Sequence, residues 1–224
     1  MSDGEIIFIV AKSVKATGLN KAARPNLQKL RTYFFQEEWE RLALLKQLPQ
    51  FPQRSKVKVL YPGCGADLFL PLFYLEQLFP QLQQAELVLV DIHNLKDTMK
   101  TLLDEVGISF SEEQESILFY WNNLLIRLTL VEGDVFELFP ALPAFDLYFE
   151  RAFRIMKDQH HDYEETVLEK LLPGGLVVSD SGFENAELQR FPVPSELSSY
   201  GEMVVGTYPL DLHTSYAHTK NRTI

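Results

Sequence analysis

The chain has 224 residues, of which 46% are hydrophobic and 23% charged, which is enough apolar material for one sizeable core. Its formal net charge is −10, because 31 Asp and Glu outnumber 21 Lys and Arg. Binding to a phosphate backbone relies on clustered basic residues, so the composition disfavours a nucleic-acid substrate. It favours a small molecule or another protein instead. No apolar run approaches the roughly 20 residues that cross a bilayer, which predicts no membrane partner.

The expected location is cytoplasmic. The apolar stretch Ile6 to Val10 is too short for the core of a signal peptide. Cys64 is the only cysteine, so no internal disulfide can form. The sequence leaves the oligomeric state open.

The first 52 residues are expected to form an extension that packs on the main domain, residues 53–224. One long helix from Pro25 to about Gln47 is predicted by apolar residues spaced three, four and eight apart, namely Leu27, Leu30, Phe34, Leu42 and Leu45. Pro25 suits the first helical turn, and the prolines between 49 and 52 end the helix. Before it, Glu5 to Val10 is expected to form a short strand.

The middle of the chain alternates between strand and helix patterns. Short apolar runs predict strands at 57–61, 87–91, 145–149 and 176–179. Helices are expected at about 67–78, 95–106 and 160–172. Continuous apolar strands that alternate with helices indicate a mostly parallel sheet covered on both faces.

A β-hairpin is expected to interrupt this alternation. The β-rich runs 116–121 and 124–131 are separated by Asn122 and Asn123, which tolerate the positive φ of a two-residue turn. The resulting register pairs Trp121 with Leu124, and it places the apolar side chains on one face. Tyr120, Arg127 and Thr129 then lie on the other face. The hairpin is expected at the edge of the sheet. Near the end of the chain, 203–208 is expected to form a strand, and the tail from Asp211 a last antiparallel partner.

The first strand ends in a glycine turn that opens directly into a helix, Gly63-Cys64-Gly65. Glycines let the chain turn sharply and let a ligand approach the backbone, and the exposed amides of the helix start attract a polar group. Two acids follow later strands: Asp91 ends the second, where a carboxylate can bind two ribose hydroxyls, and Asp134 ends the next. Pro173-Gly174-Gly175 then separates a helix from a strand and is interpreted as a helix stop.

The order of these four motifs resembles the class I S-adenosylmethionine (SAM)-dependent methyltransferases, over roughly Val57 to Asp180. The resemblance implies a Rossmann-like α/β fold, SAM as cofactor and methyl transfer, with a small molecule as the favoured acceptor. It places at the cofactor Tyr61, Pro62, Gly63, Cys64, Gly65, Asp67, Asp91, Ile92, Asp134, Val135 and Glu150. Gly63 to Gly65 would line the methionine part, Asp91 would bind the ribose, and Ile92, Asp134 and Val135 would surround the adenine.

The chain departs from this family just before the glycine turn. Tyr61-Pro62 stand where members usually carry an acidic residue that helps to position the SAM amino group, and Asp67 is the candidate replacement. Residues 149–152 lack the Asn-Pro-Pro-Tyr-type motif, which argues against methylation of base amines by that motif. Glu150 and Arg151 are the candidate catalytic residues, with a structural ion pair as the alternative.

Other functions stay open at this point. A fold that has lost catalysis and serves as a binding module is the main alternative, because of Tyr61-Pro62. A nicotinamide-dependent oxidoreductase would want a third glycine where Leu68 stands. The adjacent His160 and His161 point in different directions from a helix, so no metal site is expected.

Overall fold

The computed structural model describes residues 9–52, 54–184, 187–198 and 201–208. Its helices are α1 (Leu27–Arg31), α2 (Gln36–Arg41), η1 (Leu42–Gln47), α3 (Phe69–Leu78), α4 (Lys96–Glu105), α5 (Val135–Leu138), η2 (Phe139–Ala141), α6 (Arg154–Lys157), α7 (Tyr163–Lys170) and η3 (Ser195–Leu197). Its strands are β1 (Lys56–Pro62), β2 (Gln84–Asp91), β3 (Phe110–Glu113), β4 (Ser116–Trp121), β5 (Leu124–Glu132), β6 (Phe145–Glu150), β7 (Leu171–Ser179), β8 (Gln189–Arg190) and β9 (Val204–Thr207). None of these helices is long and apolar enough to span a membrane.

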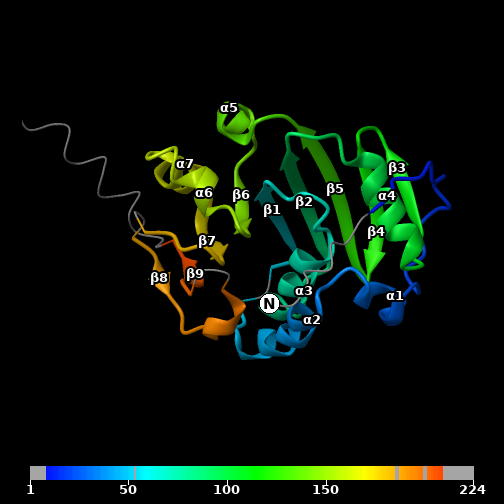
Figure 1. Cartoon of the computed structure of the whole chain (residues 1–224), viewed down its shortest axis with the longest axis horizontal. Coiled ribbons are helices and arrows are strands. Elements are labelled where there is room, and N and C mark those ends of the chain that lie inside the picture. Colours follow the sequence, from blue (N-terminus) through cyan, green and yellow to red (C-terminus); the bar gives the residue numbers. More distant parts are fainter. Residues whose placement is uncertain (1–8, 53, 185–186, 199–200, 209–224) are drawn as a thin grey trace, which may run out of the picture.

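The strands form one sheet in the order β3-β4-β5-β2-β1-β6-β7-β9-β8, with β3 and β8 at opposite ends (Figure 1). The five strands from β5 to β7 are parallel, whereas β4 and β9 run antiparallel to their inner neighbours. Numbered along the chain, the parallel strands have the order 3-2-1-4-5 of a Rossmann sheet. The expected mostly parallel, Rossmann-like α/β fold is confirmed.

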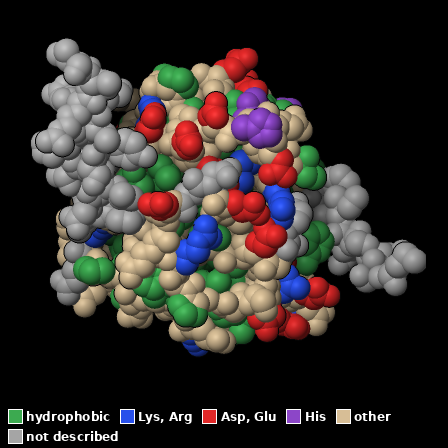
Figure 2. Space-filling model, turned by 90° about the vertical axis from the view of Figure 1, so that its left-hand side faces the viewer, with side chains coloured by type: hydrophobic (Ala, Val, Ile, Leu, Met, Phe, Trp, Pro, Cys, Tyr) green, Lys and Arg blue, Asp and Glu red, His purple; other side chains and the backbone are tan. Residues whose placement is uncertain are grey.

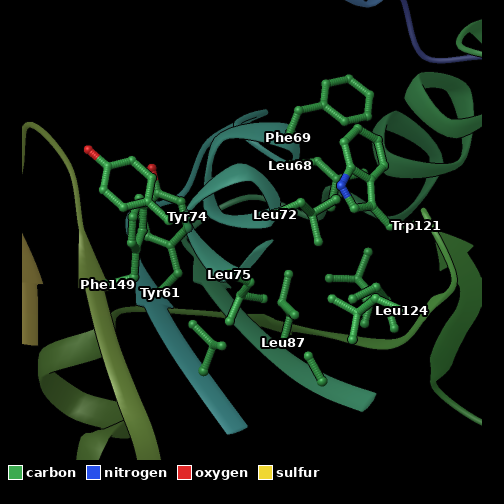
Figure 3. Packing of buried hydrophobic residues seen from close by; sticks show 14 of the residues in the cluster. Tyr61, Leu68, Phe69, Leu72, Tyr74, Leu75, Leu87, Trp121, Leu124 and Phe149 are labelled. Atoms are coloured by element: carbon green, nitrogen blue, oxygen red, sulfur yellow. The ribbon is translucent and has the colours of Figure 1, made fainter. Parts of the chain in front are cut away.

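Both faces of the sheet are buried, because alternate side chains of each inner strand enter different clusters. Val59 and Tyr61 of β1 pack with α3 and α4, whereas Leu60 packs on the opposite side with α5 and α7. Figure 1 shows α5, α6 and α7 gathered together, apart from α2 and α3. Figure 3 shows the first cluster, in which Tyr61, Tyr74 and Phe149 meet at one end and Phe69 and Trp121 at the other.

The expected hairpin is confirmed. Asn122 and Asn123 have φ of 47° and 78°, and Trp121 pairs with Leu124, as the alternating pattern predicted. The strand β3 was not predicted; it pairs antiparallel with β4 and forms the edge of the sheet. The hairpin is therefore the inner part of a three-stranded meander.

The single long helix expected between Pro25 and Gln47 is wrong. The segment forms α1, α2 and η1, and the chain is extended at Phe35, where φ is −60° and ψ 152°. The aromatic side chains between α1 and α2 find different partners: Tyr33 packs on Phe69, whereas Phe34 packs on Phe73. Tertiary packing therefore overrides the helical pattern.

The Pro-Gly-Gly segment does not stop a helix. The helix α7 ends at Lys170, and residues 172–175 form an irregularity within β7, where the register with β6 shifts. Gly174 has φ of 70° there. The expected strand at 203–208 is confirmed as β9. The predicted strand at Glu5 to Val10 falls largely on residues 1–8, and Ile9 and Val10 are not in a strand. The tail from Asp211 lies outside the described residues.

Candidate functional site

The glycine loop after β1 is tied to the end of β2. Gly63 and Gly65 have φ of 58° and 51°, a region that favours glycine. The N–H of Gly63 donates to the Val90 carbonyl over 2.8 Å, and that of Gly65 donates to Asp91 Oδ2 over 2.9 Å. Asp91 Oδ1 accepts the N–H of His93 over 3.0 Å. The loop and the acid predicted to share a ligand are therefore in direct contact.

Three hollows lie side by side at this edge of the sheet. The Asp91 hollow is lined by residues that include Cys64, Asp91, His93, Lys96 and Glu132. The loop hollow is lined by residues that include Phe34, Glu38, Cys64, Asp67 and Arg151. The β6–β7 pocket is lined by residues that include Phe34, Glu38, Tyr74, Arg151, Asp180 and Met203.

Shared residues show that the hollows adjoin one another. Cys64 lines both the Asp91 hollow and the loop hollow. Phe34, Glu38 and Arg151 line both the loop hollow and the β6–β7 pocket. Together they extend from the end of β2, past the glycine loop, to the ends of β6 and β7. In open α/β sheets this carboxyl edge, where the strand order reverses, is where ligands bind.

Asp67 lies in the loop hollow, at the place where a replacement for the missing acid was expected. Its Oδ2 accepts the Tyr61 hydroxyl over 3.0 Å and its Oδ1 the N–H of Leu70 over 3.3 Å. Arg151 Nη1 lies 3.5 Å from Oδ2. Burial raises the pKa of Asp67 to about 6, and its two hydrogen bonds lower it only in part.

Arg151 stands between the loop hollow and the β6–β7 pocket and is bound from both sides. It pairs with Asp67 and with Glu38, which comes from α2 in the N-terminal extension. Burial lowers the pKa of Arg151, and the charge of Asp180 opposes that change. Ala152 follows with φ of 51°, held by a 2.8 Å hydrogen bond from its N–H to Asp180 Oδ1.

Glu150, the other candidate catalytic residue, belongs to a buried polar network. Its Oε1 lies 2.8 Å from Lys157 Nζ and accepts the hydroxyls of Ser179 and Ser181 over 2.6 and 3.0 Å. Its Oε2 accepts the Tyr148 hydroxyl over 2.7 Å. These four donors occupy both oxygens of the carboxylate. The geometry favours the structural ion pair that was the alternative reading of Glu150.

The remaining predicted residues are mostly buried or lie away from the hollows. Cys64 is buried in the core, and burial together with the charges of Asp91 and Asp67 raises the pKa of its thiol. Asp134 caps α5 by accepting the N–H of Phe136 over 2.9 Å, and Val135 packs in the core. Seven predicted residues line none of the three hollows, namely Tyr61, Pro62, Gly63, Gly65, Ile92, Asp134 and Val135.

The structure adds site residues that the sequence analysis missed. Asp180 is an acid that directly follows β7, so the pattern that singled out Asp91, an acid at the end of an apolar strand, was present for Asp180 too. Glu38 and Tyr74 lie in segments whose sequence is typical of an amphipathic or apolar helix. No local pattern distinguishes them from helical residues outside the site. His160, one of the two adjacent histidines, stacks on Phe136 with ring centroids 3.6 Å apart. Within the described ranges, no group of three or more His, Cys, Asp or Glu is placed to hold a metal.

Charge is spread over the molecule. On the face that Figure 2 shows, Asp and Glu side chains are scattered, and Lys and Arg lie between them. The described side chains visible on this face form no continuous basic patch of the kind that would track a phosphate backbone.

The doubly wound sheet, its glycine loop and the hollows along its carboxyl edge define a Rossmann-like α/β protein with a candidate ligand site at the switch in strand order. No protein-family model and no curated protein sequence matches the chain.

Solved structures with a similar fold include methyltransferases. A putative O-methyltransferase from Klebsiella pneumoniae is 20% identical over 64% of this chain and 54% of that chain, with a TM-score of 0.35. The SAH-bound methyltransferase PaMTH1 from Podospora anserina is 20% identical over 65% of this chain and 51% of that chain, with a TM-score of 0.38. MNMC2 from Aquifex aeolicus is 15% identical over 76% of this chain and 56% of that chain, with a TM-score of 0.44. The chain thus spans about half the length of each of these three structures.

Proposed function

We propose that this protein transfers a methyl group from SAM to a small-molecule acceptor, and that it does so in the cytoplasm as one domain, residues 53–224, with residues 1–52 as an extension that completes the site. The observation that carries the proposal is the row of three adjoining hollows along the carboxyl edge of the sheet. A two-substrate reaction needs a cofactor site next to an acceptor site, and adjoining hollows support such an arrangement.

The residues present fit the cofactor. A Cβ added to Gly65 would meet no atom within 4 Å, so the loop faces open space there. Asp91 is the residue to bind the ribose, and Ile92, 65% exposed, is free to cover a ring. We assign Asp67 to bind the amino group of SAM. It would replace the acidic residue that usually stands where this chain has Tyr61-Pro62. Asp134 and Val135 fit an adenine less well, since the Asp91 hollow is lined instead by Val131 and Glu132.

SAM, when bound, would supply an activated methyl group on a positively charged sulfur, and Asp67 and Asp91 are the residues that would hold it. The protein's own residues then need mainly to bind and align the two molecules, which accounts for much of the acceleration in such reactions. The chemistry therefore does not require Glu150 as a base, in keeping with its buried network.

A binding module without catalysis is the second candidate, and one observation favours it. Gly63 packs so closely on Phe153 that an added Cβ would lie 2.9 Å from two carbons of that ring. The loop is thus filled on that side by the protein itself.

Calorimetric titration of the purified protein with SAM, S-adenosylhomocysteine and NAD(H) tests the proposal. We expect micromolar binding of SAM and its product, and none of NAD(H). Asp91→Ala should weaken this binding at least tenfold, whereas Asp104→Ala, which removes an exposed acid of α4, should leave it unchanged. Binding of neither adenosyl ligand would contradict the proposal and favour the module, with Tyr61-Pro62 as the reason.

A further inference from the structure

The loop hollow has a wall that comes from the N-terminal extension. The residues that the extension contributes to its lining are Ile9, Tyr33, Phe34, Phe35 and Glu38. Cys64, Ala66 and Asp67 of the glycine loop line the same hollow. Since the proposed cofactor lies against this loop, the extension would contact it from outside the Rossmann-like sheet. Whatever holds the extension in place therefore bears on cofactor binding.

The first part of the extension, residues 9–18, forms a strap along α4. The N–H of Lys12 donates to Thr101 Oγ1 over 2.8 Å, and Thr101 is only 1% exposed. The N–H of Gly18 donates to the Phe110 carbonyl of β3 over 3.0 Å. Figure 1 shows the strap, in dark blue, beside α4 and β3. One end of the strap thus lines the loop hollow, while the rest is attached to the main domain.

Glu105, at the end of α4, binds two separate parts of the extension. Its Oε1 pairs with Lys12 Nζ of the strap, and its Oε2 accepts the Tyr33 hydroxyl. The Tyr33 ring packs on Phe69, the first residue of α3, with centroids 5.7 Å apart. The hydrogen bonds from Lys12 and Tyr33 lower the pKa of Glu105, so the carboxylate is charged at neutral pH. One side chain of the main domain therefore fixes both the strap and the aromatic segment that follows α1.

Glu105 itself lines none of the three hollows. From its two contacts we infer that Glu105 is a positioning residue for the cofactor site, which holds Ile9 and Tyr33 in place as the wall of the loop hollow. The identity of the ligand rests on the proposed function, whereas the contacts of Glu105 do not.

The loss of Glu105 should loosen the extension and leave the main domain folded. The ion pair with Lys12 is largely exposed, since the Lys12 side chain is 61% and that of Glu105 34% accessible. Ion pairs this exposed add little to global stability. The effect is therefore expected in the local opening of the strap and in ligand affinity, and not in the unfolding of the sheet.

Amide hydrogen exchange tests the contact without any ligand. The Lys12 N–H is bonded to Thr101 and should exchange slowly in the natural protein. Glu105→Ala should speed exchange over the strap roughly fivefold, the loss of about one net hydrogen bond, and leave β1 and β2 unchanged. Asp104→Ala, which removes the neighbouring exposed acid of α4, is the matched control and should change neither. Equal exchange of the strap in Glu105→Ala and the natural protein would overturn the inference.

Calorimetric titration with S-adenosylhomocysteine measures the effect on the site. Glu105→Ala should weaken binding roughly fivefold, and Asp104→Ala should not change it. Glu105→Gln keeps an oxygen that can accept the Tyr33 hydroxyl, so it should bind more tightly than Glu105→Ala. Unchanged affinity in Glu105→Ala, or no recovery in Glu105→Gln, would overturn the inference.

A double-mutant cycle separates positioning through Glu105 from independent contacts. Tyr33→Phe removes the hydroxyl and keeps the ring on Phe69. If Tyr33 is held by Glu105, adding Tyr33→Phe to Glu105→Ala should weaken S-adenosylhomocysteine binding no further. Additive losses would mean that the Tyr33 hydroxyl acts by itself, and would exclude the positioning role.

The two measurements distinguish this inference from the proposed function. Binding of S-adenosylhomocysteine with equal affinity by the natural protein and Glu105→Ala overturns the inference alone. No binding by the natural protein overturns the proposed function, whereas faster exchange of the strap in Glu105→Ala still supports Glu105 as the residue that holds the extension.

Discussion

The N–H of Gly65 donates a 2.9 Å hydrogen bond to the carboxylate of Asp91, so the turn after β1 and the end of β2 are held as one unit. Hydrogen bonds to an ionised acceptor are stronger than neutral ones, and this one fixes a loop whose backbone conformation disfavours other residues. The acid proposed to bind a ribose thus also positions the backbone that would face the cofactor. A change at either residue is expected to affect the other.

Alanine at the two glycines of this turn should have different effects. Both have positive φ, which costs a non-glycine residue about 1–2 kcal/mol. Gly63→Ala also brings a Cβ to 2.9 Å from the Phe153 ring, whereas Gly65→Ala meets nothing within 4 Å. We expect urea denaturation to show a larger loss of unfolding free energy for Gly63→Ala. Gly65→Ala should mainly weaken SAM binding, because the proposed cofactor lies against the backbone of this loop. Equal losses of stability would contradict the packing of Gly63 on Phe153.

The parts of the fold that the sequence predicted are those encoded locally. The hairpin was readable because Asn122 and Asn123 suit positive φ and period-two alternation fixes the register. The glycine turn and Asp91 were predictable because each directly follows a short apolar run that predicts a strand. These features depend on neighbours in the sequence, not on distant packing.

The features that were missed depend on distant contacts. The break between α1 and α2 arises because Tyr33 and Phe34 pack on different residues of α3. Glu38 joins the site only because α2 folds over the end of β6, which brings it to Arg151, 113 residues away in the chain. The β6–β7 pocket likewise combines segments from both ends of the chain, and no single sequence motif predicts it.

Replacement of Lys157 by Met should strongly destabilise the protein. Lys157 is 6% exposed and lies between the carboxylates of Glu150 and Glu164, so its loss removes the ammonium that pairs with both of them. Removing one partner of a buried ion pair costs about 3–5 kcal/mol. We expect denaturation at pH 7 to show this loss, and Lys46→Met, at an exposed site of η1, to change stability by less than about 0.5 kcal/mol. A loss for Lys157→Met no larger than that for Lys46→Met would contradict the buried ion pairs of Lys157 with Glu150 and Glu164.

Asp67→Asn should stabilise the protein at neutral pH. Burial raises the folded-state pKa of Asp67 from 3.8 to about 6. Between these values the folded state binds more protons than the unfolded state, so the unfolding free energy falls as the pH rises and stays low above pH 6. Asn carries no charge and escapes this cost, which is on the order of 1–3 kcal/mol after allowance for the partial exposure of the side chain. The gain should disappear below about pH 4.

Denaturation midpoints of Asp67→Asn measured from pH 4 to pH 8 test this prediction, with Asp104→Asn as the control at an exposed site of α4. The control should show no pH-dependent difference from the natural protein. A stability difference for Asp67→Asn that does not change with pH would exclude a raised pKa at Asp67. Loss of SAM binding in the same variant would separately support its proposed role beside the amino group.

Trp121→Phe should cost little stability even though Trp121 is fully buried. Its indole Nε1 is the one buried side-chain polar atom in the described part of the chain that lacks a hydrogen-bond partner. An unpaired buried donor costs about 1–3 kcal/mol, which Phe removes, and this offsets the volume that is lost. The stack on Phe69, with centroids 5.8 Å apart, can be kept by the smaller ring (Figure 3). Trp121→Ala removes both contributions and should cost about 3–5 kcal/mol.

Urea denaturation of both variants, with Trp39→Phe at a half-buried tryptophan as the control, compares their losses of unfolding free energy. A cost for Trp121→Phe well above that for Trp39→Phe would show that the indole N–H carries no penalty in the folded protein.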